Sequence, residues 1–433
     1  MSAGIVFMIF FVLLILGVPI AITVGLASLS VSYFNPSFAA DSVFFFRSMV
    51  SGMDSYVLLA VPLFMLSGNI MARGGLSDRL FDFFSFFFGK FPSGLPIAVI
   101  LTCLFYGAIS GSGPATVAAI GAMTIPLLTS LGYKKEMVTS MIAVSGGLGV
   151  IIPPSIPYIT YGLATGTSVG DLFIAGIVPG ILIALCLIAY VIFYFRTNDN
   201  SELSIEENVK RLRDLGFIKV FKKSFFALLT PVIILGGIYT GIVTPTEAAV
   251  VSVVYAILVC TLLFRSLSIK ELARCFIDTS KTATPVMLIL SVCVVFGRIL
   301  TMLNVPQQVA ALVTENITSP IIVFLAINMF LLVVGMVMDT VPAILILAPI
   351  LLPIVREFGM DPVHFGIMMS VNLAVGFVTP PIGTNLFVAQ SLTDIPIMRI
   401  SKNALPFIGM FIVALFLITY FEGFSLFLLK FIS

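Results

Sequence analysis

Long uncharged stretches alternate with short charged ones along this chain. No Asp, Glu, Lys or Arg occurs from Phe91 to Tyr133, between Met137 and Gly170, or between Phe365 and Thr393. A transmembrane helix needs about 20 consecutive apolar residues. The pattern therefore predicts an all-α polytopic membrane protein, because a membrane β-barrel would show short alternating segments instead.

Two of the apolar stretches carry small or polar residues near their centres. Ser110-Gly111-Ser112-Gly113-Pro114 interrupts the first, and Asp339 is the one charge in the second, residues 321–355. Non-helical backbone inside a bilayer is tolerated only against protein or a water-filled cavity. We therefore expect each stretch to form a re-entrant helical hairpin with its tip inside the membrane.

A double proline follows each predicted hairpin. Gly149 precedes Pro153-Pro154, and Gly376 precedes Pro380-Pro381. Two prolines in an apolar helix remove two backbone donors and free carbonyls of the preceding turn. In a bilayer those carbonyls need another partner, and a bound cation is one such partner. Discontinuous helices in matching places of two halves indicate the binding site of a transporter.

A charged linker at residues 196–223 divides the chain nearly in half. It holds 12 of the 42 charged residues, and seven of these are Lys or Arg, so the linker is expected in the cytoplasm. The first half, 1–195, is expected to contain an arm at 55–90 and a hairpin with a broken helix at 91–170. The second half, 224–433, is expected to contain an arm at 282–320 and a hairpin with a broken helix at 321–392.

The two halves align with each other at an offset of 227 residues, the distance from Gly149 to Gly376. At this offset Pro126 falls on Pro353. Lys134 falls on Asp361, and a basic loop opposite an acidic one favours inverted structural repeats. A parallel duplication is the alternative, because the charge evidence concerns two loops alone.

The composition of the chain excludes several classes of protein. The chain is 60% hydrophobic and 10% charged with a mean hydropathy of +1.19, which excludes an ordinary soluble protein. It has no basic tract with interleaved aromatics, so we expect no nucleic-acid partner. It has no P-loop, five scattered cysteines and one histidine, His364, to which we assign no role. The apolar N-terminus lacks the positive region of a signal peptide, so we expect a retained membrane segment.

These motifs resemble the large membrane subunit, of the DctM type, of tripartite ATP-independent periplasmic (TRAP) transporters. The matching pieces extend over nearly the whole chain and are SGSGPATVAAIG (110–121), GVIIPPSIPYITYG (149–162), LFIAGIVPG (172–180), GGIYTGIVTPTEAAVV (236–251), GMVMDTVPAILILAPILLPI (335–354), DPVHFGIMM (361–369) and GFVTPPIGTNLFVA (376–389). The resemblance implies a sodium-driven symporter of organic acids, such as a C4-dicarboxylate, sialic acid or a sugar acid, in the bacterial inner membrane.

The resemblance also implies an elevator mechanism, in which a transport domain of hairpins and broken helices slides against a scaffold. It implies two protein partners, a small four-helix membrane subunit on a separate chain and a periplasmic substrate-binding protein. The carried solute would be a carboxylate, and the coupling ions would be at least two sodium ions.

The resemblance further implies the residues of a first sodium site. They are the carbonyls of Gly149, Ile152 and Pro154 and the hydroxyl of Ser110. By the internal repeat, a second site would use Gly376, Thr379 and Pro381 with the hairpin tip at Asp339 and Thr340. The alternative is that both breaks are packing kinks, and that Asp339 fixes its hairpin through a salt bridge or hydrogen bonds.

Candidate solute contacts follow the breaks. Ser155, Thr384 and Asn385 lie at the start of half-helices, where free N–H groups and the helix dipole favour a carboxylate. Arg298 is a charge deep in an apolar run and would suit an anion, although an arginine that pairs within the scaffold is the alternative.

Three other functions compete with a transporter subunit. A stand-alone ion-coupled anion transporter or exchanger would use the same broken helices. An intramembrane enzyme would need a second titratable group near Asp339, and the run from Ile321 to Val355 offers none, so we expect no enzyme. A structural assembly subunit would not need two discontinuous helices.

Overall fold

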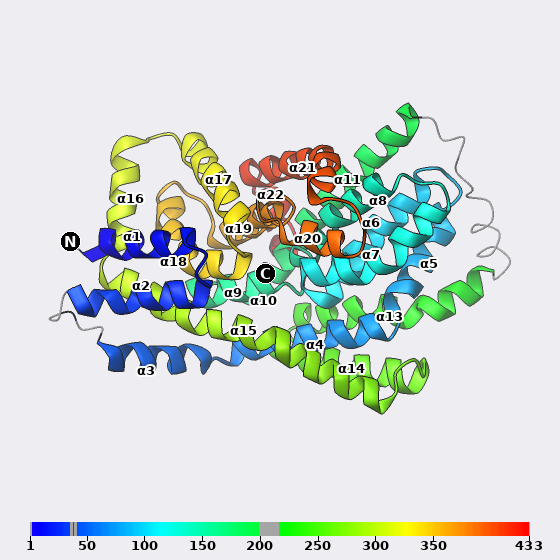
Figure 1. Cartoon of the computed structure of the whole chain (residues 1–433), viewed down its shortest axis with the longest axis horizontal. Helices are drawn as coiled ribbons and strands as arrows, with labels where there is room; N and C mark the ends of the chain where they lie inside the picture. Colours follow the sequence, from blue (N-terminus) through cyan, green and yellow to red (C-terminus); the bar gives the residue numbers. More distant parts are fainter. Residues whose placement is uncertain (1, 35–37, 39–40, 199–215, 433) are drawn as a thin grey trace.

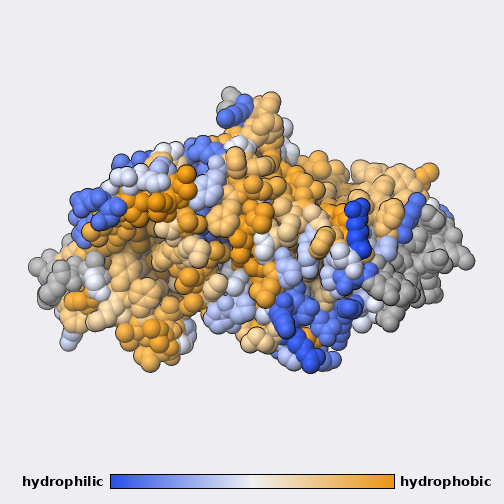
Figure 2. Space-filling view, turned by 90° about the horizontal axis from the view of Figure 1, so that it is seen from above, coloured by the Kyte–Doolittle hydropathy of each residue, from blue (hydrophilic) through white to orange (hydrophobic). Residues whose placement is uncertain are grey.

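The regular structure of the described residues is entirely helical. The computed structural model describes residues 2–34, 38, 41–198 and 216–432 (Figure 1). Eight helical segments in these ranges are long and apolar enough to cross a membrane, and several shorter apolar helices accompany them. Hydrophobic residues cover much of the face in Figure 2, with hydrophilic residues gathered in a few patches. Most of the predicted linker, 196–223, lies outside the described residues.

The N-terminal apolar run forms two helices, α1 (Ser2–Ile15) and α2 (Ile20–Phe34), which pack side by side (Figure 1). The turn between them uses Gly17 at φ +75° and Pro19, and a left-handed residue followed by a proline cannot continue a helix.

The first-half arm and hairpin follow in order. The segments are α3 (Ser42–Met53), η1 (Tyr56–Leu59), α4 (Ala60–Arg73), α5 (Leu76–Phe88), α6 (Gly94–Ser110) and α7 (Gly113–Ser130). Gly75, at φ +73°, precedes α5 and follows the end of α4 by two residues. Two residues join α6 to α7, and Gly111 at φ +61° makes this short turn possible.

The remaining elements of the first half contain the first interruption. They are α8 (Lys135–Ser145), η2 (Gly146–Val150), α9 (Ile156–Thr165), α10 (Val169–Ala175) and α11 (Ile177–Thr197). The helix stops before the cis Pro153-Pro154 bond and restarts at Ile156.

The second half comprises twelve described elements. They are α13 (Phe217–Tyr239), α14 (Pro245–Ile257), η3 (Leu258–Leu263), α15 (Ile269–Met302), α16 (Val305–Asn316), α17 (Pro320–Val337), α18 (Thr340–Glu357), α19 (Pro362–Gly376), α20 (Thr384–Ser391), α21 (Ile397–Tyr420), α22 (Gly423–Leu426) and α23 (Leu429–Ile432). The second interruption, with cis Pro380-Pro381, separates α19 from α20.

Helix starts recur at the spacing that the sequence alignment uses. Ser42 and Ile269, Gly113 and Thr340, and Lys135 and Pro362 are each 227 residues apart. The halves differ after these starts: residues 42–73 are divided into α3, η1 and α4, whereas α15 runs unbroken through Pro285.

Glycine pairs hold each hairpin against its interrupted helix. A methyl group placed on Gly107 of α6 would lie 2.8 Å from the Cα of Gly149. A methyl group placed on Gly376 would lie 2.6 Å from the Cα of Gly335 and would collide with that residue's carbonyl group. Both contacts are backbone against backbone, so neither neighbour can turn aside to make room.

We predict that Gly376→Ala destabilises the protein by about 1–3 kcal/mol, because the added methyl group forces two helices apart. Thermal unfolding of purified protein in detergent measures the effect. Gly409→Ala in α21 is the matched control, since nothing lies within 4 Å of its added methyl group. Equal unfolding midpoints for the two variants would show that the Gly335–Gly376 contact is not tight.

Candidate functional site

The first candidate site lies where the tip of the α6–α7 hairpin meets the first interruption. Ser110 Oγ is 3.1 Å from Thr116 Oγ1, and Thr116 Oγ1 donates to the Ser112 carbonyl at 2.8 Å. A methyl group on Gly149 would collide with Thr116 Oγ1 and lie 2.7 Å from the Ser112 carbonyl oxygen. The structure therefore brings Ser110 and Gly149 into one cluster, as the resemblance implies.

The residues after Gly149 approach the same tip. A methyl group on Gly111 would lie 2.9 Å from the carbonyl oxygen of Pro154, which places that oxygen beside the turn of the hairpin. Ile152 donates its amide to the Leu148 carbonyl at 3.0 Å, and its side chain packs against Gly180 of α11. Two carbonyl ligands were predicted after Gly149, those of Ile152 and Pro154. The described contacts place the Pro154 carbonyl at the tip.

The groups gathered here are oxygens: two hydroxyls and the carbonyls of Ser112 and Pro154. Such a set suits a hard cation and supplies no acid or base. A cavity of about 710 Å³ reaches this tip. Ser110, Ser112 and Tyr106 line one side of it, and Asn69 of α4 and Thr279 of α15 line another. The site therefore borders a space between the hairpin and the arm helices.

The second candidate site is built on the same backbone plan with different side chains. Gly376 lies against Gly335, and the Ile382 amide donates to the Met336 carbonyl at 3.3 Å, which ties the interruption to the second hairpin. Thr379 Oγ1 donates to the Val375 carbonyl at 2.7 Å, and Pro381 is exposed.

Asp339 begins the second helix of the second hairpin, α18. Its Oδ1 accepts from the Thr340 amide at 2.6 Å and lies 3.3 Å from the Thr340 hydroxyl. These bonds cap α18 and fix the tip, which was one of the two roles that the sequence left open for this carboxylate. Neither bond joins Asp339 to Gly376 or Thr379.

Asn385 connects the two halves. It lies in the first turn of α20, yet its Nδ2 donates to the Ala143 carbonyl of α8 at 3.0 Å. A methyl group on Gly113, at the start of α7, would lie 3.1 Å from Asn385 Oδ1. Asn385 is fully buried, and its Oδ1 and the Oγ1 of the preceding Thr384 have no hydrogen-bond partner among the described residues. Buried polar oxygens need a hydrogen-bond partner, which an ordered water or a ligand can supply.

The other two candidate solute contacts lie elsewhere. Ser155 Oγ donates to the Val150 carbonyl, so it closes the first interruption on itself. Arg298 is exposed on α15 and donates to Ser51 Oγ of α3 at 3.3 Å, which is a contact within the arm helices. The structure does not bring Arg298 to the tips or to Asn385, because α15 turns this side chain toward α3.

A buried polar network in the second half was not selected from the sequence. Asn372 of α19 donates to Asn328 Oδ1 at 2.7 Å, and Asn328 of α17 donates to Thr419 Oγ1 of α21 at 3.1 Å. His364 Nε2 lies 3.3 Å from the Thr419 carbonyl. The signal available was two lone asparagines inside apolar runs, where unpaired amides are costly. Thr116 was also missed, although it lies in the hairpin motif.

Comparison with known proteins gives one family. The profile described as "Tripartite ATP-independent periplasmic transporter, DctM component" matches residues 7–424. The chain is 41% identical over 418 residues to the isethionate TRAP transporter permease protein DctMQ of Oleidesulfovibrio alaskensis, covering 96% of this chain and 65% of that protein. It is 40% identical over 393 residues to the C4-dicarboxylate TRAP transporter large permease protein DctM of Pseudomonas aeruginosa, covering 90% of each.

Solved structures share the fold at low sequence identity. The Alcanivorax borkumensis YdaH transporter gives a TM-score of 0.65 at 12% identity, covering 90% of this chain and 91% of that chain. Neisseria gonorrhoeae MtrF gives 0.62 at 14% identity, covering 88% of this chain and 84% of that one. The chain therefore has the fold of solved transporters.

We predict that sodium raises the thermal unfolding midpoint and that Thr116→Val and Ser110→Ala each weaken this response. Loss of one oxygen ligand is expected to raise the apparent sodium Kd about tenfold, and the stabilisation at a fixed sodium concentration falls with it. A sodium titration against choline, followed by differential scanning fluorimetry, measures the response.

Thr124→Val is the matched control for this titration. Thr124 is also a buried threonine of α7, but its hydroxyl donates to the Ile120 carbonyl one turn earlier and does not face the cluster. An equal sodium response in Thr116→Val and Thr124→Val would remove the first site.

Proposed function

Because the chain belongs to the DctM component family of tripartite ATP-independent periplasmic transporters, we propose that it is the transport subunit of a sodium-coupled importer of organic acids. The family and the eight apolar helices identify a multi-pass protein of the bacterial inner membrane. The observation that carries the sodium proposal is the oxygen cluster of Ser110, Thr116 and Pro154 at the first interruption.

Sodium coupling follows from the chemistry of that cluster. In a bilayer the carbonyls released by an interrupted helix need a partner. A monovalent cation supplies one without requiring a buried carboxylate. The second interruption offers Thr379 and the backbone around Gly376 in the same relation to its hairpin, so we propose that at least two sodium ions accompany each solute.

The carried solute is a carboxylate or a related organic anion. Relatives are named for isethionate, C4-dicarboxylates and 2,3-diketo-L-gulonate, all of which are organic anions. The first turn of α20 places Thr384 at the start of a helix, with a hydroxyl that has no partner in the described residues, although the amides of Asn385, Leu386 and Phe387 already bond to carbonyls. A helix N-terminus attracts an anion, so we place one end of the solute at Thr384 and Asn385.

An elevator movement of inverted repeats is the proposed mechanism. The recurrence of helix starts at 227 residues and the two equivalent glycine contacts support a duplicated unit. The cavity between the first hairpin and helices α4 and α15 supports a boundary between a transport domain and a scaffold. On this proposal hairpins and interrupted helices move as one body, which the backbone contacts at Gly107 and Gly335 hold together.

Two partner proteins complete the proposed system. The family name specifies a tripartite, periplasmic system, so we propose a small membrane subunit and a periplasmic substrate-binding protein. The relative DctMQ is longer than this chain, which spans 65% of it. The binding protein would deliver the solute and set much of its selectivity.

We predict that proteoliposomes take up the solute when a sodium gradient and both partners are present. Replacement of the sodium gradient by potassium and ATP is expected to abolish uptake, because the chain has no P-loop. Radiolabelled C4-dicarboxylate or isethionate is the probe. Uptake at an undiminished rate without the binding protein would instead support the stand-alone exchanger.

We further predict that Thr384→Val raises the half-saturating solute concentration by about tenfold or more, because a hydrogen bond to a charged solute is worth about 1.5–3 kcal/mol. Its unfolding midpoint should stay level or rise, because valine removes a buried hydroxyl that has no partner. The control is Thr393→Val, whose hydroxyl donates to the Ala389 carbonyl at the other end of α20. Unchanged half-saturation in Thr384→Val excludes this solute contact.

A further inference from the structure

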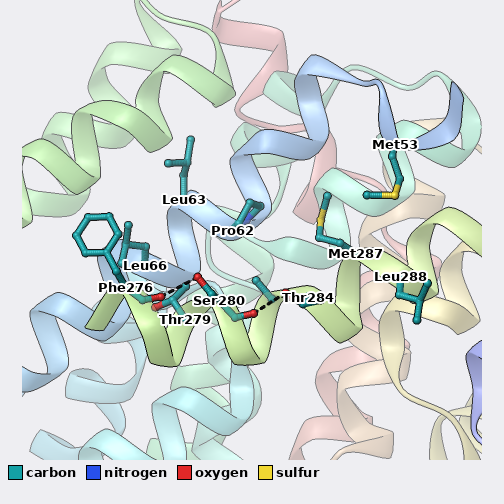
Figure 3. Close-up of a pocket in the computed structure, with 11 residues that line it drawn as sticks. Met53, Pro62, Leu63, Leu66, Phe276, Thr279, Ser280, Thr284, Met287 and Leu288 are labelled. Atoms are coloured by element: carbon teal, nitrogen blue, oxygen red, sulfur yellow. Dashed lines mark hydrogen bonds between the residues drawn. The ribbon is translucent and has the colours of Figure 1, made fainter. Parts of the chain in front are cut away.

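A groove lies between α15 and the segment from the end of α3 to α4 (Figure 3). Its volume is about 530 Å³. Met53, Pro62, Leu63 and Leu66 form one wall, and the other wall is one face of α15 with the residues Phe276, Thr279, Ser280, Ala283, Thr284, Met287 and Leu288. One end of the groove lies at Met53, where α3 ends and before α4 packs against α15.

The surface that lines the groove is apolar. Ser280 Oγ donates to the Phe276 carbonyl at 2.9 Å, and Thr284 Oγ1 donates to the Ser280 carbonyl at 2.7 Å, as the dashed lines in Figure 3 show. Thr279 Oγ1 accepts from Asn69 Nδ2 at 3.1 Å. These hydroxyls are engaged by the protein, so a hydrocarbon occupant would leave no polar group of the wall without a bond.

Basic side chains form a row on the side of α15 that carries Leu288, next to the groove. Lys270, Arg274 and Lys281 are spaced four and seven residues apart, which places them on one side of α15. Leu288, which lines the groove, follows Lys281 by seven residues and shares that side. All three basic residues are exposed, and neither salt bridge found among the described residues includes them.

The position of this row matches the level of lipid headgroups. Residues 269–281 carry five charges, whereas residues 282–297 carry none. Sixteen helical residues span about 24 Å, a large part of the roughly 30 Å hydrocarbon core. Lys281 is therefore where α15 enters the hydrocarbon, and the groove at 276–288 extends to both sides of that level. The excess of Lys and Arg fits the cytoplasmic leaflet, which holds anionic lipids.

We propose that this groove binds one acyl chain of an anionic glycerophospholipid from the surrounding bilayer, with its phosphate held by Arg274 and Lys281. The apolar walls favour an acyl chain, and the basic row favours a negatively charged headgroup. Long basic side chains reach the phosphate because their stems run along apolar surface while their heads stay at the interface. The bound lipid would join α4 and α15 across the gap where α3 ends.

Lipid binding to the full chain tests the proposal. Delipidated protein is titrated with dioleoyl phosphatidylglycerol or dioleoyl phosphatidylcholine, and native mass spectrometry counts the bound lipids. We expect one tight site that prefers phosphatidylglycerol by at least about tenfold, since each basic residue near the surface strengthens anionic lipid binding. Arg274→Gln with Lys281→Gln should reduce that preference to near unity. Lys222→Gln with Lys223→Gln on α13, where both lysines are also exposed, should retain it.

A second variant tests the groove itself. Ala283→Phe fills the groove and should displace both lipids from the tight site while the annular lipids stay. If that variant does not fold, the exposed Arg274 and Lys281 pair decides the question alone. Equal binding of the two lipids by the unmodified chain overturns the proposal. Retention of the tight lipid site in Ala283→Phe also overturns it. Loss of that site when the small membrane subunit occupies the groove overturns it as well.

Discussion

The constraint on which this structure depends is the lack of bulk water around backbone groups in a bilayer. Helices satisfy their backbone hydrogen bonds internally except at their ends. In this chain, helices end beside both double prolines. The hairpin tips lie at those stops, and the residues of the first break are buried, whereas Pro380, Pro381 and Ile382 at the second are exposed. At the first tip, the Ser112 carbonyl accepts from the Thr116 hydroxyl, and the Pro154 carbonyl lies beside Gly111. A polar site inside the membrane is thus a direct result of an interrupted helix.

The two halves share a backbone plan but differ in the chemistry placed on it. Gly107 with Gly149 and Gly335 with Gly376 are equivalent close contacts, and each excludes even a methyl group. The side chains diverge at the tips, where Ser112 caps α7 with a hydroxyl and Asp339 caps α18 with a carboxylate. A cation at the second tip would therefore meet a negative charge nearby, whereas a cation at the first would meet neutral oxygens.

Sequence reasoning predicted the features that local chemistry determines. Paired prolines and clustered glycines favour helix ends, whereas single prolines such as Pro285 lie inside helices, so the interruptions near Pro153 and Pro380 and the turn at Gly111 were predictable. The contact of Asn385 with Ala143 joins residues 242 positions apart, and no local pattern specifies it. Arg298 was an ambiguous charge because the sequence does not say which side of α15 meets α3. The polar network of Asn328 and Asn372 likewise depends on which helices become neighbours.

The reach of Asn385 across the molecule has a thermodynamic consequence. One amide side chain belongs to α20 of the second half and bonds to α8 of the first, beside the first hairpin. A ligand that bonds to Asn385 Oδ1 would alter the packing around Gly113. A cation at the first tip would in turn alter the surroundings of Asn385. Such mutual influence is reciprocal in free energy, so each occupant must change the affinity of the other by the same factor.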